Sequence, residues 1–221
     1  SSDLATSYMS PETLTAMKHN MFTPGNYFYN GIGHVTVNYG KVITYGYSEY
    51  IKEIEEELAG MRVSDANYCK KHALLEAMLI SLRAVIRYAK RYSRLAEKEQ
   101  NGTRKAELLK ISENCDRVPE SGARNFYEAC QSFWFIQMLI QVESSGHSIS
   151  PGRFDQYMYP FYKKSLDAGM TREQAQEYID CIWVKLNDLN KCRDAVSAEG
   201  FAGYSLFQNL IAGGQNVHGE D

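Results

Sequence analysis

The chain has 221 residues, 44% of them hydrophobic, so it can bury a sizeable core as one large domain or two small ones. Its 24 basic and 27 acidic residues leave a formal net charge of −3, which gives no electrostatic reason to expect nucleic acid as a partner. No stretch is apolar for the length that a membrane span needs, and the chain does not start with a signal-peptide pattern. The five cysteines form no C-x-x-C pair, which argues against a zinc or iron–sulfur site and indicates a reducing, cytoplasmic compartment.

The first quarter of the chain alternates between helix signals and turn signals. A Ser-Pro-Glu sequence at 10–12 predicts a helix start, and the Thr-Pro-Gly-Asn sequence at 23–26 breaks that helix. β-branched residues at 34–37 then predict a short strand. Apolar residues at helical spacing predict a helix over 41–58, with its glutamates on the solvent side.

The rest of the chain is predicted to be mostly helical, with one long polar loop and a final strand. Apolar residues at spacings of three and four predict further helices over about 66–99, from the turn at 101–103 to about Cys115, over a buried stretch carrying Phe126 to Ile140, over 154–166, and from a capping box at Thr171 and Gln174 through Leu186. A mostly apolar strand is predicted over 204–212. These patterns predict a helix-rich α/β chain with at least two strands, in a single partial domain over 1–221 whose two ends both look truncated.

The polar loop over 143–155 is the most unusual local feature, because it follows a buried helix and mixes Glu, His, Arg and Asp. A metal site would use Glu143, His147 and Asp155, but their spacings match no helical ligand pattern. A Ser–His–acid nucleophile is also conceivable, although no strand–turn–helix elbow frames these serines. The interpretation that the residues favour is a loop held by its own polar network, with Arg153 bridging Asp155 or Glu143.

Two other features carry competing interpretations. Cys192 lies between two cationic residues near a helix end, so its thiol is a candidate for a lowered pKa, although a helix C-terminus that attracts cations explains the same pattern. A group of aromatic residues could line a pocket for a cation through the ring faces, although such groups more often belong to a core. The group consists of Phe22, Tyr27, Phe28, Tyr29 and Tyr39. The residues by themselves therefore do not reach a reaction.

Several stretches, taken together and in order, resemble one family. Residues 146–160, Gly-His-Ser-Ile-Ser-Pro-Gly-Arg-Phe-Asp-Gln-Tyr-Met-Tyr-Pro, are similar to the signature loop of the pyruvate formate-lyase-like glycyl radical enzymes. The helix at 124–135 resembles the buried helix that leads into that loop. Residues 33–42, 183–187 and 213–215 fit the same family, so the resemblance covers nearly the whole chain. Within the family, residues 23–31 and 187–210 are most similar to choline trimethylamine-lyase.

The resemblance implies that the chain is a helix-rich part of a ten-stranded β/α barrel. It implies a glycyl radical, installed by a partner radical S-adenosylmethionine activating enzyme, that is passed to a cysteine and cleaves choline to trimethylamine and acetaldehyde. The thiyl cysteine, its partner glutamate and the radical glycine would all lie beyond Asp221, so this chain holds no catalytic residue, bound cofactor or metal. It would supply pocket wall, be inactive alone, and belong to a cytoplasmic homo-oligomer, with a bacterial microcompartment as an alternative location.

Three positions are implied as substrate-binding by the same resemblance. Phe207 looks like the family's substrate-contacting phenylalanine. Phe22 and Asn30 fall where choline enzymes place a tyrosine and an aspartate, so a hydroxyl and a carboxylate are lost near the substrate cation. Two alternatives therefore stay open: another glycyl radical eliminase, such as a glycerol or propanediol dehydratase, and a catalytically inert structural fragment.

Overall fold

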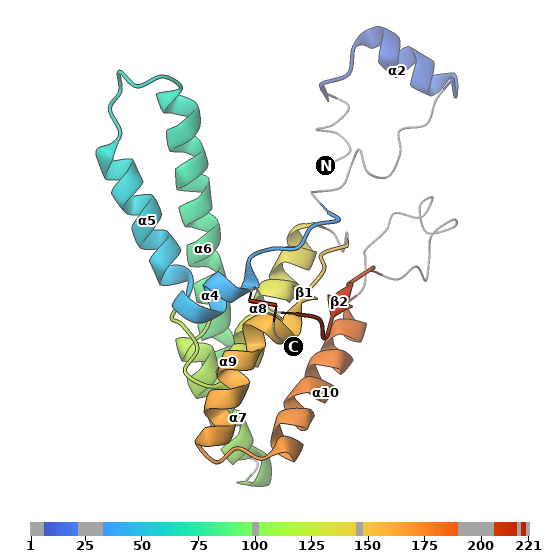
Figure 1. Cartoon of the computed structure of the whole chain (residues 1–221). Coiled ribbons are helices and arrows are strands. Elements are labelled where there is room, and N and C mark those ends of the chain that lie inside the picture. Colours follow the sequence, from blue (N-terminus) through green and yellow to red (C-terminus); the bar gives the residue numbers. More distant parts are fainter. Residues whose placement is uncertain are drawn as a thin grey trace.

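The computed structural model describes residues 7–21, 33–98, 102–144, 148–189, 206–215 and 218–219. Helices dominate these residues, and two short strands lie beside the helical body (Figure 1). The helix-rich α/β prediction is thereby confirmed. The elements are α2 (Pro11–Lys18), α4 (Tyr39–Tyr45), α5 (Tyr47–Gly60), α6 (Tyr68–Ala96), α7 (Gly102–Arg117), α8 (Phe126–Glu143), β1 (Gly152–Arg153), α9 (Phe154–Asp167), α10 (Arg172–Asp188) and β2 (Leu210–Ile211).

Helix α8 is the centre of the main core, as its all-round apolar character predicts. Its side chains pack against α4, α9 and α10, and Phe133 is completely buried, with its ring 5.2 Å from Tyr39 and 5.0 Å from Phe154. Asn125 caps the helix by accepting a hydrogen bond from the Glu128 backbone N–H. The buried members of this core are Tyr39, Val42, Ile43, Phe126, Ala129, Cys130, Phe133, Ile136, Phe154, Met158, Ala175, Ile182 and Leu186.

Helices α5 and α6 form a hairpin that extends away from the rest of the described chain (Figure 1). A separate small core of Ile54, Leu75 and Leu79 holds the two helices together. The glutamates of α5 lie off this apolar stripe, as predicted. Two of the resulting surface ion pairs cross the hairpin, from Arg83 to Glu55 at 2.6 Å and from Lys71 to Glu57 at 2.6 Å.

The helix predicted over 41–58 is in fact two helices, α4 and α5, separated at Gly46. Gly46 has a φ of +82°, and a Cβ atom there would lie 2.3 Å from the backbone oxygen of Glu120. Backbone hydrogen bonds tie this junction to the loop before α8, from Tyr47 N to Pro119 O and from Ser48 N to Glu120 O. The apolar spacing carries through the break because both helices face cores, so periodicity alone could not locate it.

The strands form a narrow parallel arrangement of three segments. β1 pairs with β2, with Gly152 opposite Leu210, and Val35 forms an isolated parallel bridge with Ile149. The strand predicted over 34–37 is therefore reduced to a single bridge, and that predicted over 204–212 to Leu210–Ile211 within the described residues. The second strand begins late because the Asn209 N–H bonds to the Phe207 carbonyl in a tight turn and to the Ser150 hydroxyl, not to a backbone carbonyl of a neighbouring strand.

Candidate functional site

Three residues with left-handed backbone conformations lie at the same end of the three parallel segments. His34 has a φ of +57°, Ser148 of +55° and Phe207 of +52°. His34 and Ser148 directly precede the bridged pair of Val35 and Ile149, and the register of β1 with β2 brings Phe207 level with that pair. Non-glycine residues in this region cost about 1–3 kcal/mol each and concentrate at functional sites. This end of the strands, formed by His34, Ser148 and Phe207, is called the strand-start site below.

The backbone of Phe207 is held firmly while its ring stays accessible. The Ser150 hydroxyl donates a hydrogen bond of 3.3 Å to the Phe207 carbonyl and accepts one of 3.2 Å from the Asn209 N–H. The Phe207 side chain nevertheless remains 48% exposed. A fixed backbone with an open aromatic face is the arrangement that a residue needs in order to shape a pocket wall.

Close backbone packing draws the three segments together behind the strand-start site. Gly152 has a φ of +66°, and a Cβ atom there would lie 2.6 Å from Thr36 Cγ2. Gly152 N also donates to Asn209 O, and Ser150 N to Val35 O. Only glycine tolerates both the backbone conformation and this approach, so Gly152 fixes the spacing of all three segments.

Two of the three positions that the resemblance implied, Phe22 and Asn30, lie outside the described residues, as do Tyr27, Phe28 and Tyr29. Tyr39 is the described member of that aromatic group, and it is 1% exposed. Its ring stacks on Tyr157, its hydroxyl hydrogen-bonds to Gln137, and burial raises the pKa of the hydroxyl. Tyr39 therefore belongs to the core, not to a cation pocket.

The polar loop is anchored differently from the predicted network. Arg153 donates a hydrogen bond to the carbonyl of Gln215, and Asp155 accepts from the Gly213 N–H at 2.6 Å. Neither Asp155 nor Glu143 forms an ion pair with Arg153, so that prediction is wrong. The Arg153 and Asp155 side chains instead hydrogen-bond to the backbone of the segment after β2. The backbone N–H and C=O groups of that segment need such partners because its strand ladder is short.

No residue that the structure describes supports the metal site or the reactive thiol that the sequence left open. His147 and Cys192 lie outside the described ranges, and no three His, Cys, Asp or Glu side chains cluster within them. Of the described thiols, Cys115 and Cys130 are buried, and burial raises the pKa of Cys115 to about 12. A thiol with so high a pKa is protonated at neutral pH and packs as a small apolar group.

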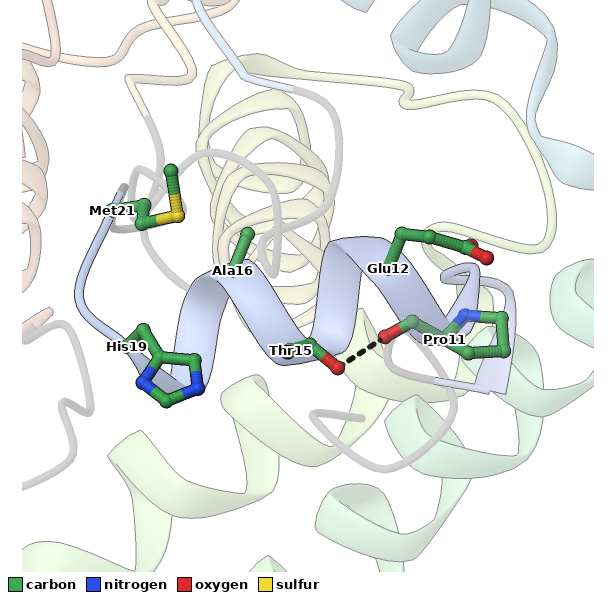
Figure 2. Close-up of a pocket in the computed structure, with 6 residues that line it drawn as sticks. All are labelled: Pro11, Glu12, Thr15, Ala16, His19 and Met21. Atoms are coloured by element: carbon green, nitrogen blue, oxygen red, sulfur yellow. Dashed lines mark hydrogen bonds between the residues drawn. The ribbon is translucent and has the colours of Figure 1, made fainter.

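A separate hollow lies along α2 (Figure 2). It is lined by Pro11, Glu12, Thr15, Ala16, His19 and Met21. All six come from this helix and the turn after it, and no α2 residue is buried. Its only drawn hydrogen bond is the local one from Thr15 Oγ1 to Pro11 O, at 2.8 Å. The hollow shares no residue with the strand-start site, and it offers no convergent polar groups.

Sequence reasoning did not single out His34 or Ser148. His34 falls within the short strand predicted over 34–37, and Ser148 falls within the polar loop over 143–155. Left-handed conformations are enriched for His but are unusual for Ser and Phe, so residue type gives little warning of them. The sequence feature that could have indicated His34 is the Gly-x-Gly at 31–33 directly before it, because glycine adopts backbone conformations that other residues rarely do.

The comparisons with known proteins establish the family. The model of the "Pyruvate formate lyase-like" family matches residues 1–221, so the chain belongs to this family of glycyl radical enzymes. Within the described residues, no helix is long and apolar enough to cross a membrane.

Three relatives show the range of proteins to which the chain is similar. An isethionate sulfite-lyase of Desulfovibrio desulfuricans is 38% identical over 83% of this chain and 23% of its own length. A solved structure described by 1,2-propanediol dehydration in Roseburia inulinivorans has a TM-score of 0.86 and 64% identity over 99% of this chain and 28% of that one. The glycerol-bound B12-independent glycerol dehydratase of Clostridium butyricum has a TM-score of 0.85 and 51% identity over 100% of this chain and 28% of that one. The chain thus spans about a quarter of these relatives, which include a lyase and dehydratases.

Proposed function

We propose that this chain is part of a glycyl radical dehydratase that acts on a small vicinal diol, with propane-1,2-diol or glycerol as substrate. The observation that carries the proposal is the strand-start site, where an exposed aromatic ring lies level with a histidine and a hydroxyl residue. The similarity to a propanediol-dehydrating structure and to a glycerol dehydratase, which both extend over almost the whole chain, supports the same substrate class.

The groups at the strand-start site suit a neutral diol better than a quaternary ammonium. The His34 imidazole and the Ser148 hydroxyl can each donate and accept a hydrogen bond, which matches two adjacent substrate hydroxyls. In this structure His34 is exposed and Ser148 is 6% exposed. The Phe207 ring offers an apolar face to the carbon chain. No carboxylate is among these three residues, whereas a fixed cation is held by aromatic faces and acidic groups. Choline cleavage is therefore retained only as the alternative.

The proposed reaction removes one water from the diol, so that propane-1,2-diol gives propanal and glycerol gives 3-hydroxypropanal. The reactive cysteine, the glutamate and the radical glycine are proposed to lie in segments after Asp221, and a radical S-adenosylmethionine enzyme is proposed to install the radical. This chain would bind and orient the substrate and help to exclude water from the intermediate. The full-length protein is proposed to be a cytoplasmic homo-oligomer.

The test is to replace His34 by Ala and Phe207 by Leu in the full-length protein, activated under strict anaerobiosis. We expect each change to raise the KM for propane-1,2-diol by about tenfold or more, because each removes a contact to a small substrate that has few others. Matched controls are His72→Ala and Tyr159→Leu, a partly buried histidine on α6 and an exposed aromatic residue on α9. Equal KM values for variants and controls would show that the strand-start site does not face the substrate.

A further inference from the structure

Beneath the strand-start site, Gln137 joins the Phe207 segment to two helices through its buried amide. Gln137 is completely buried on α8. Its Nε2 donates one hydrogen bond of 2.7 Å to Gln208 Oε1 and another of 2.9 Å to the Ile149 carbonyl. Its Oε1 accepts the hydroxyl hydrogen bond of Tyr39, from α4. Both the nitrogen and the oxygen of the Gln137 amide thus have hydrogen-bond partners, which fixes the orientation of the amide.

The second amide, Gln208, continues the connection to α10. Its Nε2 donates a hydrogen bond of 3.0 Å to the carbonyl of Leu186, in the last turn of that helix. Gln208 directly follows Phe207, so the hydrogen bonds of its side chain and those of the Ser150 hydroxyl both hold the tight turn. Reversing the Gln137 amide would face its oxygen toward two acceptors, so the network has one favourable orientation.

We infer that Gln137 and Gln208 are positioning residues, which hold Phe207 in its left-handed conformation and thereby set the shape of the substrate pocket. A left-handed phenylalanine persists only where the surroundings over-determine it, and these two amides supply fixed partners on α4, α8 and α10. The effect on substrate rests on the proposed function, whereas the effect on the Phe207 turn does not.

Gln141 provides a matched control on the same helix, one turn after Gln137. It is 3% exposed, and its Nε2 donates to the same Ile149 carbonyl at the longer distance of 3.4 Å. Its Oε1 has no hydrogen-bond partner among the described residues. Gln141→Met therefore removes a buried amide next to the loop and leaves the bond to Gln208 intact.

The experiment compares Gln137→Met, Gln208→Met, the double variant and Gln141→Met in the full-length protein. Amide hydrogen exchange of the peptide covering 206–211 is measured without activation, and the KM and kcat for propane-1,2-diol are measured after it. We expect the two single variants to speed exchange and to raise the KM between about 10- and 100-fold. The double variant should show no faster exchange and no higher KM than the more strongly affected single variant, because both residues act through one contact. Gln141→Met should change neither quantity.

The outcomes separate this inference from the proposed function. If Gln137→Met and Gln208→Met exchange no faster than Gln141→Met, the positioning role is wrong, whatever the substrate. If they exchange faster but the KM stays unchanged, the amides hold the turn without setting the pocket, and the inference is also overturned. If the unaltered, activated protein dehydrates no diol, the proposed function fails, and the exchange comparison alone decides whether the amides hold Phe207. If Gln137→Met does not fold, Gln208→Met still tests the inference, because Gln208 is only partly buried.

Discussion

Glu128 shows how a single charged residue can be kept inside the main core. Its side chain is completely buried, and its carboxylate binds the Arg124 backbone N–H at 2.7 Å and the Arg124 guanidinium. Arg117 contributes a second cation at 3.5 Å. Burial alone would raise the pKa of this carboxyl, but the hydrogen bonds and charges of the two arginines outweigh it, so the pKa is lowered.

Replacing Glu128 by Gln should therefore destabilise the protein in a pH-dependent way. Because the folded-state pKa lies below the ordinary value, the charged group stabilises the fold above that value and loses its effect as pH falls through the folded-state pKa. We expect the variant to lose about 2 kcal/mol of unfolding free energy at neutral pH and less under acid. Chemical denaturation at several pH values measures this. A constant difference at all pH values would contradict it, and Glu113→Gln, in an exposed pair with Lys110, is the control.

At the scale of elements, sequence patterns predicted which segments are helical better than where they end. The capping box at Thr171 and Gln174 forms in full, because it depends only on residues within one turn. The break at Gly46 and the short strands depend on distant contacts, with the loop at 118–123 and between segments far apart in the chain. Such contacts leave no local pattern, so the prediction over 41–58 joined two helices.

The junction at Gly46 should tolerate no side chain. Gly46→Ala would place a Cβ atom against the backbone oxygen of Glu120 and force a left-handed alanine, so we expect a loss of about 3 kcal/mol or more in unfolding free energy. Gly60→Ala, in the last residue of α5 with no atom within 4 Å of the added Cβ, should be neutral or stabilising by about 0.5 kcal/mol. Equal melting temperatures for the two variants would show that the α4–α5 junction is not fixed by this contact.

The candidate site illustrates the limit of sequence reasoning for the whole molecule. Phe207 was placed by resemblance, and the structure brings it level with His34 and Ser148, which no pattern had singled out. That arrangement arises from the register of three parallel segments more than fifty residues apart, and register is a property of the assembled fold. Phe22 and Asn30 lie outside the described residues, so their predicted substrate contacts stay predictions.

Several large apolar side chains are exposed on this chain, which spans about a quarter of the relatives named above. Trp183 and Val184 on α10 and Ile211 on β2 are 44%, 63% and 52% exposed. Ordinary soluble proteins avoid large contiguous apolar patches, so in the proposed full-length enzyme we expect further segments of the barrel to cover these side chains. The activity proposed for the chain therefore has to be tested in that longer protein.

The most direct test of the proposed function is product analysis of the full-length protein, activated by its radical S-adenosylmethionine enzyme under strict anaerobiosis. Propane-1,2-diol, glycerol and choline are supplied separately, and the unactivated protein is the control. Under the proposed function, we expect propanal from propane-1,2-diol or 3-hydroxypropanal from glycerol, and no trimethylamine from choline. Trimethylamine without either aldehyde would contradict it and establish choline as the substrate. A detectable glycyl radical with none of the three products would exclude all of these substrates.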